Sequence, residues 1–427
     1  MRLAPMAAIL AVAVIGTPAA QAAPAREWID QTTGHRIIRI SQAPGSTSLY
    51  FHQNSYTRQG DKMVISTPDG IAVVRLADWR VTPLVRQTGI KLLLVGRRTR
   101  TAYYTQPHGA GVIVHGVDID SGKVRRIATV ARGSIGSINA DETLLLGQWA
   151  EREPPLQPGG DGNRPGETAF AATGADGKPL SYADAKEVRL NQRLEAKIPM
   201  EIFTINIRTG ARKVVVASTD WLNHVQFSPT DPARILYCHE GPWHKVDRIW
   251  TIRTDGSDQR LVHKRAMNME IAGHEFFSPD GKWVWYDLQT PRGEVFWLAG
   301  YELATGKRRW FPVARDQWSV HYNQSPDGQR FSGDGGDAQM VARASDGKYL
   351  TLFTPQPIPD VAGIRADNAD DLTEPGTLQA EKIVDLARHD YRLEPNVTFT
   401  PDGRWMIFRS NMEGASHVYA AEVATTK

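Results

Sequence analysis

Residues 277–286 read Phe-Ser-Pro-Asp-Gly-Lys-Trp-Val-Trp-Tyr, and this stretch decides the fold because its pattern recurs along the chain. Ser/Thr-Pro-Asp-Gly is a tight-turn signal, and the alternating apolar run behind it is typical of a half-buried strand. Further copies of the phrase, some of them degraded, begin at Tyr56, Ile138, Phe227, Gln324 and Phe399. Recurrence of one short turn-and-strand unit indicates a repeat protein.

A second phrase alternates with the first and consists of a strand, a glycine-containing hairpin turn and another strand. Its copies lie at residues 118–123, 206–210, 253–256 and 302–306. Together the two phrases give a four-stranded unit of roughly 40 to 50 residues, the period of a propeller blade. Six units are clear or degraded, and strands within 92–114 supply a seventh. The sequence therefore predicts an all-β chain that folds as a seven-bladed β-propeller, whereas a β-sandwich would not need this repeat.

Two segments interrupt the repeat. Residues 154–178 are rich in Gly and Pro and should form a loop, while residues 182–197 contain helix-forming residues behind Ser181, a suitable N-cap. We expect a helical and loop insertion at about 151–198 that lies over one face of the propeller. Residues 355–386 should form a second long loop, with a possible helix at 378–386.

The first 22 residues have the pattern of a signal peptide. Arg2 supplies the positive charge, residues 7–15 the apolar stretch and Ala20-Gln21-Ala22 the small-residue cleavage site. The apolar stretch is shorter than the ~20 residues that span a bilayer, and no later stretch qualifies. We expect a single propeller domain over residues 23–427, no membrane span, and a periplasmic or secreted location. An uncleaved membrane anchor is the alternative.

Composition excludes several classes of protein. The net charge is +3 without a run of Lys or Arg, which argues against nucleic acid as a partner. Cys238 is the single cysteine, so no intramolecular disulfide can form. The sequence contains no G-x-S-x-G elbow, no Walker loop and no H-E-x-x-H, which argues against a hydrolase domain attached to the propeller.

Titratable residues recur at one position of the repeat. His274, His321 and Glu394 precede the glycine of the next turn by seven, seven and nine residues. Equivalent positions in successive blades converge on the axis of a propeller, so these side chains should meet. With Asn396 they would form a set of ligands for a divalent manganese, iron, zinc or calcium ion. Alternatively, each residue makes hydrogen bonds within its own blade.

Basic residues accompany this set. Arg248, His224 and Lys245 would add positive charge to the same face, and His52 precedes the first repeat turn and would lie at the same mouth. Such a site suits an acidic oligosaccharide.

Five phrases resemble the oligogalacturonate lyase family, within a similarity that extends from about Tyr50 to Val423. They are Asp-Trp-Leu-Asn-His at 220–224, Cys-His-Glu-Gly-Pro at 238–242, Val-Asp-Arg-Ile-Trp at 246–250, His-Glu-Phe at 274–276 and Ser-Gly-Asp-Gly at 332–335. The resemblance implies a seven-bladed propeller with a central manganese ion. It also implies cleavage of short galacturonate oligomers by β-elimination, which yields unsaturated keto-uronates.

The resemblance also implies roles for single residues. His321 matches a metal ligand, and His274 and Arg248 match residues that act in catalysis. We expect His274 to be the base and Arg248 the alternative base or the group that binds the carboxylate, with His239 as a further candidate base. His224, Lys245 and His52 are the expected substrate-binding residues.

One cluster departs from the family pattern. Where the family has a glutamine and a His-x-His pair as metal ligands, this chain has Tyr391, Glu394 and Asn396. Oxygen atoms can replace imidazoles around a divalent cation, so we expect these three residues to complete the metal site with His321. The change favours a harder site and leaves manganese, calcium, iron and zinc open.

Two other functions fit the same repeat. The chain could be a non-catalytic periplasmic propeller that binds a glycan or a protein, although such a scaffold has no need of the His, Arg and Glu set. It could also be a lyase for a different uronate glycan, which the change at Glu394 and Asn396 favours.

Overall fold

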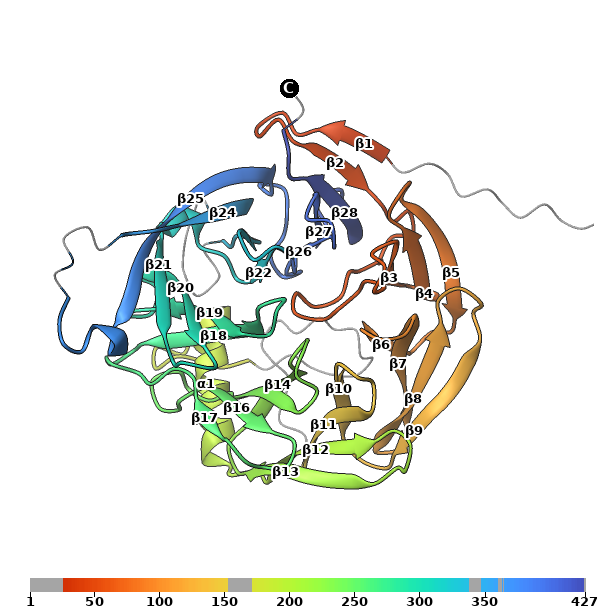
Figure 1. Cartoon of the computed structure of the whole chain (residues 1–427), viewed down its shortest axis with the longest axis horizontal. Coiled ribbons are helices and arrows are strands. Elements are labelled where there is room, and N and C mark those ends of the chain that lie inside the picture. Colours follow the sequence, from red (N-terminus) through yellow and green to blue (C-terminus); the bar gives the residue numbers. More distant parts are fainter. Residues whose placement is uncertain (1–25, 153–170, 338–346, 360–362, 364, 426–427) are drawn as a thin grey trace, which may run out of the picture.

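The computed structural model describes residues 26–152, 171–337, 347–359, 363 and 365–425, and the proposed signal peptide lies outside them. These residues form seven antiparallel blades around one axis, two of which are joined into one eight-stranded sheet by the parallel pair of β21 and β25, so the predicted seven-bladed β-propeller is confirmed (Figure 1). Blade 1 has three strands, blades 2 to 6 have four each, and blade 7 has five. The innermost strand of each blade faces the axis.

The strands follow the chain order from blade to blade. Blade 1 contains β3 (Lys62–Thr67), β4 (Gly70–Arg75) and β5 (Arg80–Arg86). Blade 2 contains β6 (Lys91–Val95), β7 (Thr101–His108), β8 (Gly111–Asp118) and β9 (Val124–Val130). Blade 3 contains β10 (Ser134–Ile138), β11 (Leu144–Ala150), β12 (Met200–Asn206) and β13 (Arg212–Ser218). Blade 4 contains β14 (Leu222–Phe227), β15 (Arg234–His239), β16 (Ile249–Arg253) and β17 (Arg260–Leu261).

The remaining blades complete the ring. Blade 5 contains β18 (Ile271–Phe277), β19 (Trp283–Gln289), β20 (Phe296–Glu302) and β21 (Arg308–Val313). Blade 6 contains β22 (Tyr322–Gln324), β23 (Phe331–Gly333), β24 (Tyr349–Pro357) and β25 (Thr373–Asp385). Blade 7 contains β26 (Thr398–Phe399), β27 (Trp405–Ser410), β28 (His417–Glu422), β2 (Arg36–Arg39) and β1 (Arg26–Ile29). Two short 3₁₀ turns lie at Arg315–Gln317 and Ala369–Asp371.

The recurring turn is built by its own residues. In the best copy, the Ser278 hydroxyl donates to Asp280 and accepts from the backbone N–H of Trp283. Gly281 has φ = 72°, a left-handed conformation that glycine adopts without a steric penalty. The copies that begin at Ser325 and Thr400 repeat these contacts. The Ser/Thr-Pro-Asp-Gly phrase therefore fixes the connection from the innermost strand to the next one.

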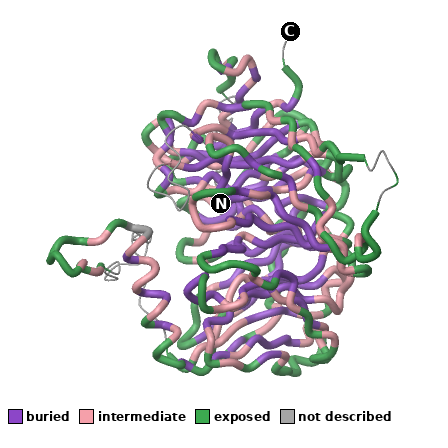
Figure 2. The backbone as a smooth tube through the Cα atoms, turned by 90° about the vertical axis from the view of Figure 1, so that its left-hand side faces the viewer, coloured by how far each residue is buried: buried purple, intermediate pink, exposed green. Residues whose placement is uncertain are grey.

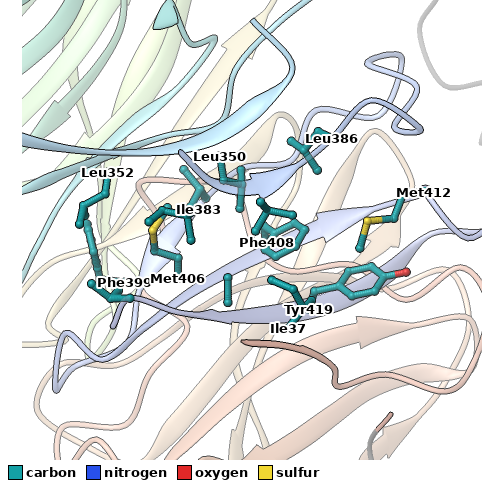
Figure 3. Close-up of a cluster of buried hydrophobic side chains, with 14 of the residues drawn as sticks. Ile37, Leu350, Leu352, Ile383, Leu386, Phe399, Met406, Phe408, Met412 and Tyr419 are labelled. Atoms are coloured by element: carbon teal, nitrogen blue, oxygen red, sulfur yellow. The ribbon is translucent and has the colours of Figure 1, made fainter. Parts of the chain in front are cut away.

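Blade 7 closes the ring by joining the two ends of the described chain. β2 pairs antiparallel with β28, with Ile37 opposite Ala421. Between blades 6 and 7 lies a core of apolar side chains from both blades (Figure 3). Leu350 and Ile383 of blade 6 and Phe408 of blade 7 are fully buried there. This closure fixes the blades around the axis without a disulfide.

The segment 355–386 differs from its prediction. The helix expected at 378–386 is wrong, because these residues belong almost entirely to β25, which pairs with β24 over Tyr349–Pro357 and also runs parallel to β21. Gly376, Leu378 and Ala380 are less exposed than the residues between them, a period of two. Pairing with β24 outweighs the helix propensity of the local sequence.

The insertion lies within blade 3, between β11 and β12. Its helix α1 (Tyr182–Glu195) has Ser181 as N-cap, which accepts from the Asp184 N–H, so the predicted helix is confirmed. The expected loop at 154–178 falls largely outside the described residues. Seen edge-on, the ring is a thick disc and the helix stands against one of its flat faces (Figure 2). None of the helices in the described part of the chain has the length and apolarity to cross a bilayer.

Candidate active site

One position of the repeat supplies the polar groups at the axis. His224, His274, His321 and Asn396 each stand four residues before the Ser or Thr that opens the turn. The innermost strands β14 and β18 contain register shifts at Asn223–Gln226 and Gly273–Phe276, which redirect the side chains of His224 and His274. These two histidines have φ = 49° and Asn396 has φ = 54°. Non-glycine residues in this conformation store strain and concentrate at functional sites.

His274 and His321 form the centre of the site. Their ring centroids lie 4.8 Å apart in an edge-to-face arrangement. His274 Nδ1 is 2.8 Å from Asp287 Oδ1, and His321 Nδ1 is 2.7 Å from Asp334 Oδ2. Because a carboxylate accepts the Nδ1 proton in both pairs, the Nε2 atoms are the ones free to take a proton or bind a cation. Burial opposes the charged form of His321, but Asp334 and Glu394 outweigh it and raise its pKa.

A row of buried charges continues from these histidines into blade 4. Arg248 Nε donates to Glu275 Oε2 at 3.1 Å, and Arg248 Nη1 lies 4.0 Å from Glu240 Oε1. Glu240 in turn accepts from Asn223 and lies 3.8 Å from His224 Nε2. Burial alone would raise the pKa of Glu240, but the positive groups around it, led by His224 and Arg248, lower it to about 2. Both carboxylates therefore stay ionised and hold Arg248 charged and fixed.

A loop ahead of blade 1 covers the axis between these blades. Tyr50 contacts the rings of both His224 and His321, at centroid distances of 6.1 and 5.2 Å. His52 packs against Tyr50 at 5.0 Å, and burial lowers its pKa to about 3. The structure thus brings together six residues singled out in the sequence, together with Glu240 and Glu275. We call this set the axial cluster: His52, His224, Glu240, Arg248, His274, Glu275, His321 and Glu394.

Two expected site residues lie elsewhere. His239 packs on Tyr237 and Trp250, and its Nδ1 is 3.0 Å from Asp220. It therefore points to the other face of the blade 4 sheet from Cys238 and Glu240, its neighbours along the chain. Lys245 is exposed and donates to Asn191 of α1 at 2.7 Å. The structure therefore places both residues outside the axial cluster: His239 packs within blade 4, and Lys245 is hydrogen-bonded to the insertion.

Tyr391 and Asn396 form hydrogen bonds with the backbone around the axial cluster. The Tyr391 hydroxyl donates to the Asp334 carbonyl at 3.0 Å, within the core between blades 6 and 7. The Asn396 side chain accepts from Phe51 N–H and donates to the Glu394 carbonyl. Both side chains are thus engaged with the backbone, and we do not count them among the cation ligands.

Lys186 and Glu240 were missed by the sequence analysis. Lys186 lies on α1, and it interacts electrostatically with Glu240, Glu394 and Arg248. The only sequence signal for Lys186 was its place in the predicted insertion, because a single lysine in a helix forms no recognisable motif. Glu240 belongs to the phrase Cys-His-Glu-Gly-Pro, and alternation along β15 would have placed it with Cys238 and opposite His239.

A divalent cation fits one part of the axial cluster. His321 Nε2 is buried without a hydrogen-bond partner and lies 3.7 Å from Glu394 Oε2. An imidazole held by a carboxylate and aimed at a second carboxylate is a common arrangement of metal ligands. His224, Cys238 and Glu240 also have ligand atoms within 4.8 Å of one another. Burial raises the pKa of the Cys238 thiol, and Arg248 lies beside it, so this second group is a poorer cation site.

Fold and site together define a β-propeller with an axial cluster of carboxylate-held histidines, a buried arginine and a candidate cation site at His321 and Glu394. A model of the family described as oligogalacturonate lyase matches residues 177–426, more than half of the sequence. The chain therefore belongs to the oligogalacturonate lyase family.

Curated relatives agree with this assignment, and solved structures share the fold. The oligogalacturonide lyase of Pectobacterium atrosepticum is 27% identical over 233 residues, which is 52% of this chain and 55% of the relative. The oligogalacturonate lyase of Dickeya dadantii is 26% identical over the same shares. The chain thus spans about half the length of the curated relatives it matches. An oligogalacturonate lyase solved in complex with manganese superposes with a TM-score of 0.71 at 20% identity, over 94% of this chain and 97% of that one. A second such enzyme, from Vibrio parahaemolyticus, also gives 0.71 at 20% identity, over 94% of this chain and 96% of that one.

Proposed function

We propose that this chain is a lyase that cleaves short uronate oligosaccharides by β-elimination, with galacturonate oligomers from pectin as the first candidate substrate. The proposal rests on one observation. His274, whose Nδ1 is held by Asp287, and Arg248, which is buried and hydrogen-bonded to Glu275, both belong to the axial cluster. Family membership supports the same reaction.

The difficult step is removal of the proton on C5, next to the sugar carboxylate. His274 Nε2 is the base in our proposal, since Nδ1 is held by Asp287 and the carboxylate of Asp287 stabilises the imidazolium that forms. As the C5 proton leaves, the C4–C5 double bond forms and the C4–O bond to the neighbouring sugar breaks. The departing oxygen takes up a proton.

Negative charge builds on the sugar carboxylate during this step, and positive groups of the axial cluster offset it. Arg248 is held charged by Glu275 and Glu240, and remains too basic to accept the proton because these carboxylates raise its pKa. It is therefore the group that binds the carboxylate. His321 and Glu394 would hold a divalent cation, manganese first, which when bound supplies Lewis-acid stabilisation of the same carboxylate.

A product assay tests the proposal directly. Purified protein is incubated with a panel of uronic oligosaccharides, and the ultraviolet absorbance of the unsaturated product is followed. We expect cleavage of di- or trigalacturonate, its loss in excess chelator and its return with added manganese. Full activity in chelator, without bound metal by elemental analysis, would assign carboxylate neutralisation to Arg248 alone. If no uronate is cleaved, the result favours the alternative of a non-catalytic propeller that binds a glycan or a protein.

A lyase for another uronate is the second candidate. It is favoured by Glu394 and Asn396, which depart from the His-x-His pair that the resemblance to the family implies at these positions. The same panel separates the two, because the preferred sugar is the one with the largest kcat/KM.

We further propose that the protein works outside the cytoplasm, on the strength of the signal-peptide pattern in residues 1–22. Sequencing of the N-terminus from the native host should begin near Ala23. An intact Met1 on cytoplasmic protein would contradict this.

A further inference from the structure

The insertion helix α1 is docked on the propeller at three points. Glu187 forms an ion pair with Arg292 of blade 5, Arg189 lies 4.5 Å over the Trp221 ring, and Asn191 accepts from Lys245 of blade 4. The helix therefore crosses from blade 4 to blade 5 on a fixed path (Figure 1).

Lys186 lies on the face of α1 that meets the ring. Leu190, one turn further along the same face, is 1% exposed and belongs to the core that contains Trp221 and Trp243. Lys186 itself is half-buried, and its Nζ lies 5.7 Å from the centre of the Trp243 ring. Burial lowers the pKa of this lysine, and the carboxylates of Glu240 and Glu394, from two different blades, partly offset that effect. The helix thus directs one cation at the axial cluster.

Lys186 differs from the other cations around the axis. Arg248 is hydrogen-bonded to Glu275, and Arg292 is paired with Glu187. Within the described part of the chain, Lys186 makes the cation–π contact with Trp243 but no ion pair with a carboxylate. Withdrawing an ammonium group from water is unfavourable unless an anion compensates it. A carboxylate of the ligand is an anion of the right charge and size.

We propose that Lys186 binds the carboxylate of a second uronate unit, next to the unit whose C5 proton is removed. Arg248 and Lys186 would then each bind one carboxylate of neighbouring sugars, so that α1 selects substrates with acid groups on both sides of the cleaved bond. This inference rests on the proposed lyase function. Lys186 is a substrate-binding and specificity-determining residue and takes no part in the proton transfer.

The test compares two substrates and two positions. Digalacturonate is compared with the same disaccharide carrying a methyl ester on the unit that does not lose its C5 proton. For digalacturonate, Lys186→Met should lower kcat/KM roughly 10- to 100-fold, mainly through KM, because a hydrogen bond between charged groups is lost. For the ester, wild type and variant should agree within about twofold. Lys186→Arg should recover part of the loss with digalacturonate.

Lys197→Met is the matched control. This lysine follows the same helix, and 59% of its side chain is exposed, so it carries the same charge without reaching the axial cluster. Both substrates should react with this variant as with wild type. Circular dichroism and thermal unfolding of Lys186→Met should match wild type, which separates a lost contact from a displaced helix.

Failure of the inference and failure of the proposed function give different results. If wild type cleaves digalacturonate and Lys186→Met impairs both substrates equally or neither, the lyase stands and the second-carboxylate contact is wrong. If wild type cleaves no uronate, the lyase proposal fails. The contact is then judged by calorimetric binding of the two disaccharides, where equal affinity of wild type and Lys186→Met for digalacturonate overturns it.

Discussion

Blades 2 and 3 and blades 4 to 7 use the same repeat position for different purposes. Four residues before the turn, blades 2 and 3 have Leu92 and Ile135, which are 4% and 2% exposed and belong to apolar cores. Blades 4 to 7 have His224, His274, His321 and Asn396 there, three of them with positive φ. A register shift accompanies this position in blades 2 to 5 alike.

The register shift therefore occurs in both groups of blades, which differ in the side chain at this position and in its backbone conformation. Apolar side chains there add burial, whereas polar ones bring strain and buried charge to the axis. We infer that the first half mainly stabilises the ring and the second half mainly provides the chemistry. Only substitutions in the second half should accordingly change turnover, whereas substitutions in either half can change stability.

The largest expected effect is on turnover, from the polar half. His274→Ala should lower kcat on the cleaved uronate by about 10²–10⁴-fold, because the base is lost, while the melting temperature changes little. His108→Ala, at an exposed position of blade 2, is the control and should leave kcat unaltered. Retained turnover in His274→Ala would move the base elsewhere in the axial cluster.

A second substitution in the polar half should reduce stability. Arg248→Met leaves Glu275 and Glu240 buried without their cation, and should cost about 3–5 kcal/mol in the free energy of unfolding by denaturant titration. The double variant Arg248→Met/Glu275→Leu should recover much of this loss. Arg253→Met, which breaks an ion pair at the surface of the same blade, should cost no more than about 1 kcal/mol. Equal losses of unfolding free energy in the two arginine variants would argue against buried ion pairs between Arg248 and the two glutamates.

The apolar half should respond in stability alone. Ile135→Val removes one buried methylene and should cost about 0.5–1.5 kcal/mol in the free energy of unfolding, with kcat/KM unchanged. Activity that falls without a change in stability would show that blade 3 also shapes the site.

The last expected effect is a dependence of stability on pH. The pKa of His52 is lowered to about 3 by burial, so between pH ~6.5 and 3 the unfolded chain binds a proton that the folded chain does not. The free energy of unfolding should therefore fall as the pH drops through this window. His52→Gln should flatten the fall when urea unfolding is compared at pH 7, 5 and 4, whereas Ile135→Val should leave its slope as in wild type. An unchanged slope in His52→Gln would mean that His52 is not buried in solution.

Part of the site was predictable from sequence because the repeat shows which residues occupy equivalent positions in successive blades. Gly281, Gly328 and Gly403 mark one turn, so counting back from them places His274, His321 and Glu394 at one axis. The same count does not reveal whether the polar atoms of a side chain already form hydrogen bonds with the backbone. Tyr391 and Asn396 lie at the expected place, yet their polar atoms bond to the backbone. Alternation along β15 separates His239 from Glu240, and the choice between them depends on which face meets the axis.

The sequence by itself determined the blades, their number, the turns between strands and the helix of the insertion, because all of these depend on residues close together in the chain. Only the tertiary structure decided that residues 378–385 form a strand, that Lys245 anchors α1 and that Lys186 lies over the Trp243 ring. Each of these depends on partners that are distant in sequence. A local pattern records the propensity of a segment, whereas its final conformation and contacts follow from the free energy of packing against the rest of the ring.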